Sequence, residues 1–177
     1  MGIQTLLIVA AVFGEKVLNL GASKLIASIL LIQIVAIGGA YLMSVIAKKI
    51  GNIKVLLVVV FFWILICGAS YYMSHEYHFY AMAFAVGLLM GGIQSLSRST
   101  YSKLIPQDIE DTTSFFSFYD VTEKIAVVIG LFSFGFIEQI TNNIRYSALF
   151  LSVFFIIGFL LLFRVLKFNN LQLIQSN

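Results

Sequence analysis

The chain has 177 residues, of which 60% are hydrophobic and only 11% charged, and its mean hydropathy is +1.01. Soluble domains carry about 25% charged residues, and a soluble core of this size cannot bury several apolar stretches of about 20 residues each, so the composition excludes a soluble fold. The net charge of +3 comes from Lys and Arg scattered between apolar segments without a basic patch, which excludes a nucleic-acid-binding protein.

Six apolar segments follow one another, separated by short polar linkers. None alternates polar and apolar residues, so we expect helices, which satisfy their own backbone hydrogen bonds in lipid. At 1.5 Å per residue, about 20 residues cross a hydrocarbon core of about 30 Å. The expected helices are 2–20, 25–47, 55–73, 79–103, 114–138 and 146–167. The sequence therefore predicts an all-α, polytopic membrane protein with a single six-helix domain over residues 1–177.

Polar residues divide these six spans into two groups. The first span, beginning MGIQTLL without the basic leader of a signal peptide, carries Gln4 and Thr5, and the second carries Gln33. The fourth carries Gln94, and the fifth is charged. The third and sixth spans contain neither a charge nor an amide along VLLVVVFFWILICGASYYM and ALFLSVFFIIGFLLLF, so we expect that they can face lipid all round.

The linkers predict the orientation of the chain. Seven Lys and Arg residues fall on one side and three on the other, and basic residues favour the cytoplasmic side. Both termini are therefore expected in the cytoplasm. The first set is Lys48, Lys49, Lys54, Arg98, Lys103, Arg164 and Lys167, and the second is Lys16, Lys24 and Arg145.

The fourth span has a small residue at every fourth position, which forms one smooth helical face. Such a face lets another helix approach closely, and the alternative is a glycine-lined path for a substrate. The positions are Ala83, Gly87, Gly91, Ser95 and Ser99.

The fifth span contains three charges within five residues. Lys124 lies about 13 Å from its cytoplasmic end, close to the middle of the bilayer, where a charge costs roughly 2.5 to 3.5 kcal/mol. Asp120 and Lys124 are one turn apart and suit an ion pair, which leaves Glu123 as a surplus acid. The trio either holds this helix against its neighbours, or borders a water-filled path where it binds a charged substrate or a coupling proton.

Motifs for metal or covalent chemistry are not found. HEYH, from His75 to His78, lacks the spacing that places two zinc-binding histidines one turn apart on a helix, and we expect it in a solvated loop. No nucleophile elbow or phosphate-binding glycine loop occurs, and Cys67 has no local base. We therefore expect no enzyme activity, no cofactor and no metal.

Two motifs carry a resemblance to a known family. The stretch GGIQSLSRSTYSKLIPQD, residues 91–108, followed by FFSFYDVTEKIAVVIG, resembles the vacuole-effluxer-like family of the major facilitator superfamily, related to a yeast vacuolar amino-acid effluxer linked to autophagy. GIQTLLIVAAVFG and LLIQIVAIGGAYL resemble its seventh and eighth helices. The matching positions are Gly91, Gly92, Gln94, Ser97, Arg98, Ser99, Pro106, Phe115, Phe116, Tyr119 and Lys124.

The resemblance implies the carboxy-terminal half of a twelve-helix carrier, of which this sequence is then a fragment. It places helices seven and ten around the central cavity, eight and eleven against the other half, and nine and twelve outside. The residues implied to bind substrate or couple its movement are Gln4, Thr5, Gln33, Gln94, Asp120, Glu123 and Lys124.

A cytoplasmic gate is implied as well. The linker SVIAKKIGNIK resembles the superfamily's gate loop at Lys49 and Gly51, although Lys48 replaces the acid, and the alternative is a basic anchor that only sets topology. The gate candidates are Lys48, Lys49, Gly51, Ser97, Arg98, Ser99 and Pro106.

The expected function is secondary active transport of a small solute by alternating access, with small amino acids as the class that the family suggests. The expected partners are the lipid bilayer, a solute with a coupling proton, and an amino-terminal half or a second copy of this chain. The expected location is multi-pass in a membrane, the inner or plasma membrane if the cell is bacterial. The alternatives are a membrane scaffold or assembly subunit without transport activity, and a channel formed by several copies.

Overall fold

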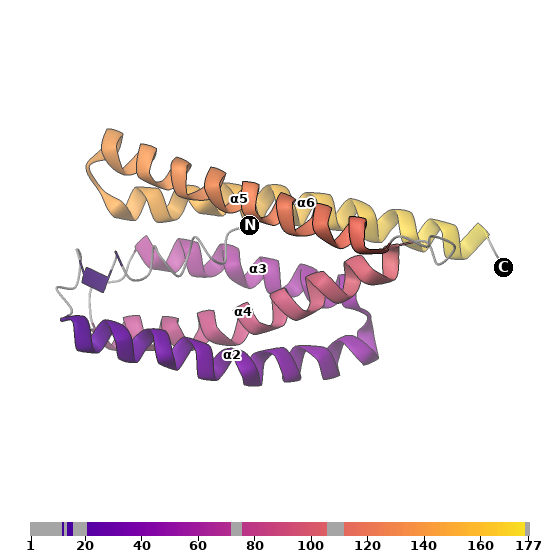
Figure 1. Ribbon diagram of the computed structural model, residues 1–177, viewed down its shortest axis with the longest axis horizontal. Helices are drawn as coiled ribbons and strands as arrows, with labels where there is room; N and C mark the ends of the chain where they lie inside the picture. Colours follow the sequence, from indigo (N-terminus) through magenta and orange to yellow (C-terminus); the bar gives the residue numbers. More distant parts are fainter. Residues whose placement is uncertain (1–11, 13, 16–20, 72–75, 106–111, 176–177) are drawn as a thin grey trace.

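Five long helices make up the part of the chain that the structure describes. The computed structural model describes residues 12, 14–15, 21–71, 76–105 and 112–175. The helices are α2 (Ala22–Ile50), α3 (Asn52–Tyr71), α4 (Glu76–Leu104), α5 (Thr112–Thr141) and α6 (Ile144–Gln175), and they run roughly along one axis (Figure 1). Each has a stretch long and apolar enough to cross a membrane. The all-α prediction is therefore confirmed.

The first expected span, 2–20, lies almost entirely outside the described residues, together with Gln4 and Thr5. The other five expected spans each overlap one helix. A transmembrane helix over residues 2–20, which would bring the number to six, and the half-carrier fold therefore stay predictions. His78, expected in a loop, lies instead in the first turn of α4.

Short connections fix the order of neighbouring helices. Gly51 alone separates α2 from α3, with a φ of 94°, a conformation that glycine adopts without steric cost. Its N–H donates to the carbonyl oxygen of Ala47 at 2.9 Å and closes the last turn of α2. Between α5 and α6, Asn142 also has a positive φ, and the side-chain oxygen of Asn143 accepts the N–H of Arg145. Both connections reverse the chain within a few residues.

The apolar stretches of α3 and α4 are the most buried of the five, and α3 packs against α6 and α4. Val59 and Trp63 are fully buried, and the Trp63 ring stacks on Phe155 of α6 with the ring centroids 5.5 Å apart. The expectation that the third span can face lipid all round is therefore wrong. A helix that is apolar on every side can enter a protein core as readily as it can face lipid, so composition alone does not choose between the two.

The helices α2 and α4 approach each other most closely through glycines. A Cβ atom at Gly39 would overlap the backbone of Leu88, and one at Gly91 would overlap the carbonyl oxygen of Ala36. Ala83 and Gly87 share the buried side of α4 with Gly91, whereas Ser95 and Ser99 are exposed. Close packing of two backbones in this way is the usual basis of helix association in membranes.

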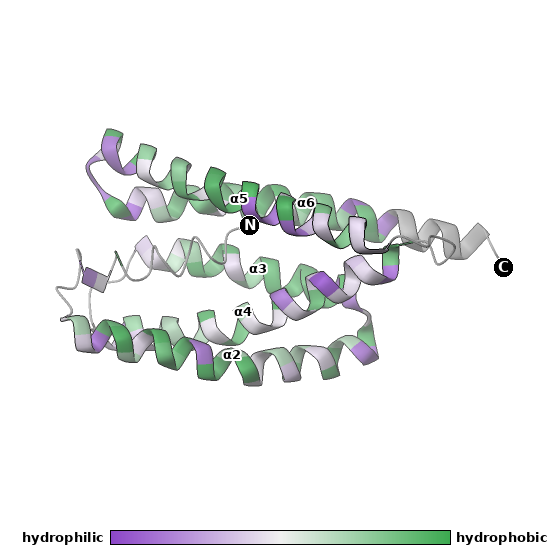
Figure 2. Cartoon of the chain, in the orientation of Figure 1, coloured by the Kyte–Doolittle hydropathy of each residue, from purple (hydrophilic) through white to green (hydrophobic). Residues whose placement is uncertain are grey.

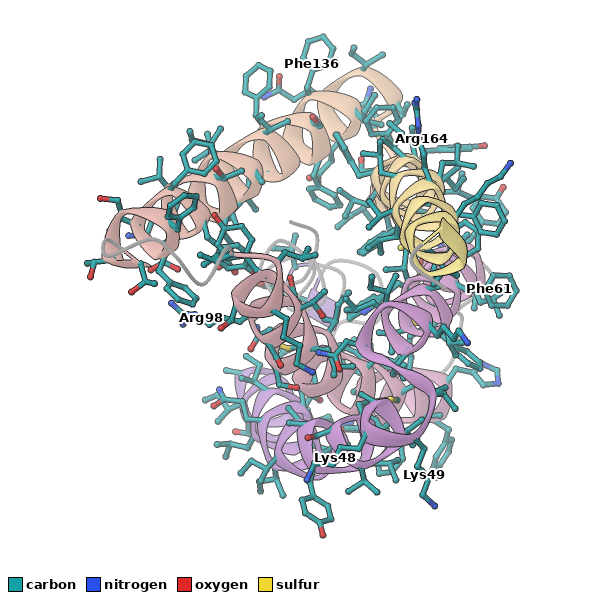
Figure 3. The ribbon with its side chains drawn as sticks, turned by 90° about the vertical axis from the view of Figure 1, so that its right-hand side faces the viewer. Lys48, Lys49, Phe61, Arg98, Phe136 and Arg164 are labelled. Atoms are coloured by element: carbon teal, nitrogen blue, oxygen red, sulfur yellow. The ribbon has the colours of Figure 1, made fainter. Side chains whose placement is uncertain are left out.

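Apolar side chains point outward from the bundle in Figure 3, and the ribbon in Figure 2 is mostly hydrophobic, with hydrophilic residues at helix ends and at a few places within the helices. Phe61 and Phe136 are exposed, as a lipid-facing surface requires. Figure 3 looks at the end where α2, α4 and α6 finish, with Lys48 and Lys49 pointing outward on α2. Basic residues expected on one side of the membrane therefore do lie at one end of the bundle.

Candidate functional site

The helices α4 and α5 are joined by side chains near the end of α4 and the start of α5. One guanidinium nitrogen of Arg98 donates to both carboxylate oxygens of Asp120, at 3.0 and 3.3 Å. The hydroxyl groups of Ser97 and Tyr119 lie 2.8 Å apart in a hydrogen bond. We call these four residues the clasp.

Aromatic contacts surround the clasp. The Tyr101 hydroxyl donates to the carbonyl oxygen of Phe115 at 3.1 Å, and its ring lies against Phe116 and Tyr119. The Arg98 guanidinium carbon lies 5.9 Å from the centroid of the Phe116 ring, within cation–π range. No Cα atom of α4 lies within 8 Å of one in α5, so side chains alone connect these two described helices.

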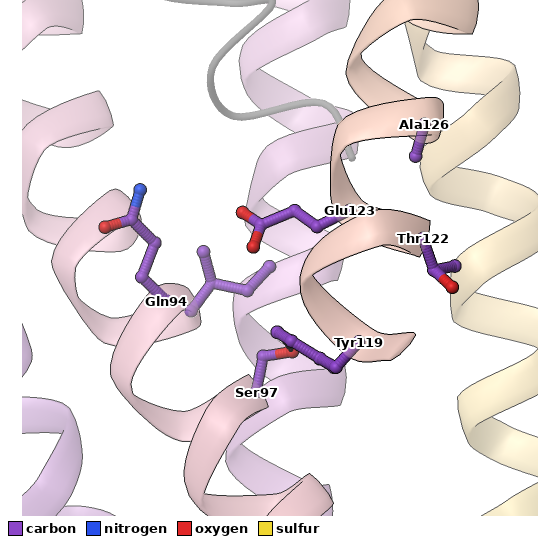
Figure 4. Close-up of a pocket in the computed structure, with 7 residues that line it drawn as sticks. Gln94, Ser97, Tyr119, Thr122, Glu123 and Ala126 are labelled. Atoms are coloured by element: carbon purple, nitrogen blue, oxygen red, sulfur yellow. Dashed lines mark hydrogen bonds between the residues drawn. The ribbon is translucent and has the colours of Figure 1, made fainter. Parts of the chain in front are cut away.

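Next to the clasp, the two helices enclose a cleft of about 260 Å³ (Figure 4). Glu123 extends from α5 toward α4 in this space. An adjoining cavity of about 230 Å³ is lined by Gln94, Arg98, Tyr119 and Glu123. The cleft itself is lined by Ile93, Gln94, Ser97, Tyr119, Thr122, Glu123 and Ala126.

The cleft lies about halfway along α4 and α5. Gln94 is ten residues from the end of α4 and Glu123 is eleven from the start of α5, which corresponds to about 15 Å along each helix. A hydrocarbon core is about 30 Å thick, so these polar groups lie near its middle. An amide and a carboxylate at that depth require protein, water or a solute as their neighbours.

The expected ion pair between Asp120 and Lys124 does not form in the structure. Asp120 binds Arg98 from α4 instead, because the guanidinium reaches both carboxylate oxygens from across the cleft. Lys124 is exposed, on the side of α5 that also carries the exposed Val121 and Val128, and makes no ion pair with any described residue. Glu123 is thus the acid of this trio that faces the cleft.

The remaining candidates lie elsewhere or are not described. Gln33 is exposed on α2 and does not line the cleft. Lys48 and Lys49 are in the last turn of α2 and Gly51 is in the turn that follows, while Ser99 accepts a hydrogen bond from Asn52 at 3.3 Å. Pro106, Gln4 and Thr5 lie outside the described residues.

Sequence reasoning missed two residues in this region. Asn52, at the start of α3, links α4 by donating to Ser99 and accepting from Lys103, each at 3.3 Å. Thr122 lines the cleft, although its hydroxyl donates to the carbonyl oxygen of Phe118 on its own helix. Neither residue stands out in sequence, because short polar side chains are common at helix ends and within helices. No group of three or more His, Cys, Asp or Glu that could hold a metal ion occurs among the described residues.

Comparisons with known proteins agree with the membrane architecture. A transporter of major facilitator type, YxiO of Bacillus subtilis, is 27% identical over 161 residues, which cover 91% of this chain and 37% of that protein. Autophagy-related protein 22 of Cryptococcus neoformans is 32% identical over 93% of this chain and 31% of its own length. The same protein of Eremothecium gossypii is 42% identical over 82 residues, 46% of this chain and 16% of that protein.

The chain therefore spans about a third of the length of the first two of these relatives. No solved structure matches it. The family described as vacuole effluxer Atg22-like matches residues 1–169, nearly the whole sequence. With its apolar helices and a polar cleft at membrane depth, this multi-pass membrane protein belongs to the vacuole effluxer Atg22-like family of transporters.

Proposed function

We propose that this chain supplies the carboxy-terminal six helices of a secondary transporter, which moves a small solute by alternating access between two halves. The observation that carries the proposal is the cleft between α4 and α5, which Gln94 and Glu123 both line about halfway along a largely apolar bundle. Carriers of this type bind their solute near the bilayer midplane. No chemistry on the solute is proposed.

The outer face of α5 supports a second half. Lys124 is exposed about 18 Å along this helix, beside apolar Val121 and Val128. Leaving such a charge in lipid costs roughly 2.5 to 3.5 kcal/mol, so protein is the better cover. We propose an amino-terminal half of the same transporter as that cover, with both termini of this chain in the cytoplasm.

Small amino acids are the solutes that we propose. They fit a cleft of about 260 Å³, and the cleft offers the amide of Gln94 and the carboxylate of Glu123 as hydrogen-bonding groups. The family's description as vacuole effluxers supports export from a compartment as the activity to test.

The test is counterflow in proteoliposomes. The native product, with any amino-terminal half that it has, is reconstituted with unlabelled amino acids inside, and the uptake of labelled amino acids is followed. A carrier shows saturable uptake that the internal pool accelerates. We expect Gln94→Leu to reduce this uptake, whereas Gln139→Leu, which removes an exposed amide near the end of α5, serves as the matched control.

Other outcomes identify the other classes of protein. Uptake that rises without saturation and ignores the internal pool indicates a channel. Absence of uptake with every amino acid, from a protein that is monodisperse and folded, argues against an amino-acid carrier and favours a scaffold. Equal loss of uptake in both variants would show that the amide of Gln94 has no specific role in binding the solute.

A further inference from the structure

Two of the three acids of α5, Asp120 and Glu123, differ in their partners. Asp120 is neutralised by Arg98 through contacts of 3.0 and 3.3 Å. Glu123, one turn further along the helix, makes no hydrogen bond or ion pair with any described residue. Its side chain extends into the cleft and lines both adjoining cavities (Figure 4). One carboxylate of the pair is therefore used in holding α4 to α5, and the other is left for a ligand.

The surroundings of Glu123 leave its charge uncompensated among the described residues. Arg98, the cation that shares a cavity with it, is already held by Asp120, and Lys124 points to the outer face of α5. On α6, Arg164 and Lys167 are exposed and line neither cavity. Of the charged or titratable residues described on α4, α5 and α6, only Arg98 and Tyr119 line either cavity with Glu123.

An isolated negative charge at this depth is unfavourable and becomes stable when a positive charge binds it. Gln94 and the clasp hydroxyl groups around Glu123 are neutral and can accept or donate hydrogen bonds to the same ligand. We propose that Glu123 is the binding site in the cleft for a single positive charge, supplied by a proton or by the ammonium group of an organic solute. The inference rests on the proposed function, since it assigns the charge selectivity of the same cleft.

The experiment is carbodiimide labelling of the native protein in proteoliposomes. A hydrophobic carbodiimide reacts with protonated carboxyl groups in apolar surroundings, and peptide mass spectrometry locates the modified residue. We expect the label on Glu123 in the wild type, which requires no variant to fold. Asp120 should stay unlabelled because Arg98 holds it, and labelling of the segment should be lost in Glu123→Gln. Glu138→Gln, the same change near the far end of α5, is the control and should retain the label on Glu123.

Two arms distinguish the two sources of charge. Labelling is measured over a range of pH, and separately at fixed pH with propylammonium chloride against sodium chloride of equal ionic strength. Protection by propylammonium but not by sodium identifies an organic ammonium site. Labelling of Glu123 that persists to a higher pH than labelling of Glu138, without protection by propylammonium, identifies a proton site. Absence of label from Glu123, or a label on Asp120 at equal extent, overturns the inference.

The labelling is independent of transport, so the two proposals can fail separately. Labelled Glu123 without counterflow of amino acids would contradict the proposed function and support the cation site. Counterflow without a reactive Glu123 would support the carrier and contradict the cation site.

Discussion

Alanine at two adjacent glycines of α2 should have opposite effects on stability. Gly38 has no atom within 4 Å of the position that a Cβ would take, whereas at Gly39 that position lies 2.7 Å from the carbonyl carbon of Leu88 and 2.8 Å from its Cα. The crowding atoms belong to the α4 backbone and cannot rotate away. The two helices must separate to admit the methyl group at Gly39 and need not move at all for Gly38.

The magnitudes follow from two opposing effects. Replacing Gly by Ala within a helix gains about 1 kcal/mol at either position. Overpacking typically costs about 1 to 3 kcal/mol, and overlap with a backbone lies at the upper end of that range. We therefore expect Gly38→Ala to raise the free energy of unfolding by about 1 kcal/mol and Gly39→Ala to lower it by about 2 kcal/mol.

The assay is unfolding of the native protein by SDS in mixed micelles, followed by the fluorescence of Trp63, the single tryptophan of the 177 residues. Trp63 is fully buried against Phe155, so its emission reports the packed bundle. Circular dichroism monitors helix content as a check. If Gly39→Ala proved as stable as Gly38→Ala, the close contact between α2 and α4 would be refuted.

Two further substitutions test the core and the clasp. The indole N–H of Trp63 is buried without a partner among the described residues, so Trp63→Phe should cost less than about 1.5 kcal/mol, whereas Trp63→Ala should cost about 3 to 5 kcal/mol. Because both variants lack the fluorophore, circular dichroism follows their SDS titration, and similar losses in both would contradict the packing. For the partly exposed ion pair of the clasp, a double-mutant cycle with Arg98→Gln and Asp120→Asn should give a coupling energy of about 0.2 to 1 kcal/mol that weakens in high salt. A coupling energy of zero would mean that the two side chains do not stabilise each other.

The sequence was sufficient to predict the five described helices, because length and hydropathy are local properties that a bilayer converts directly into structure. It was not sufficient for contacts between helices. The spacing of Asp120 and Lys124 is a fact about one helix, and Arg98 reaches Asp120 only because α4 lies across the cleft. Glu123 was recognised as surplus from its angle on the helix, but its direction into a cavity depends on where α4 lies.

The burial of α3 could not be predicted from the sequence either. Its residues are apolar on every side, so the sequence contains no face that marks the core. Gln33 is the opposite case, since this polar residue at depth is exposed on α2 and does not line the cleft, so its part in a binding site stays a prediction. In a membrane bundle, polarity shows which residues need neighbours, and the arrangement of the helices decides which neighbours they have.

The clasp joins α4 and α5 near one end of each helix, so the two helices can tilt about this connection. Their direct contacts are confined to the last turns of α4 and the first turns of α5, so a tilt about that end changes the gap least at the pivot and most at the far tips. A tilt of about 10° about the clasp moves Gln94 and Glu123, which lie about 5 Å from it along their helices, by roughly 1 Å, and moves the far end of α4, about 30 Å away, by roughly 5 Å. The gap between the far ends of α4 and α5 can therefore widen by several ångströms while the ion pair between Arg98 and Asp120 stays intact and the cleft beside it changes little.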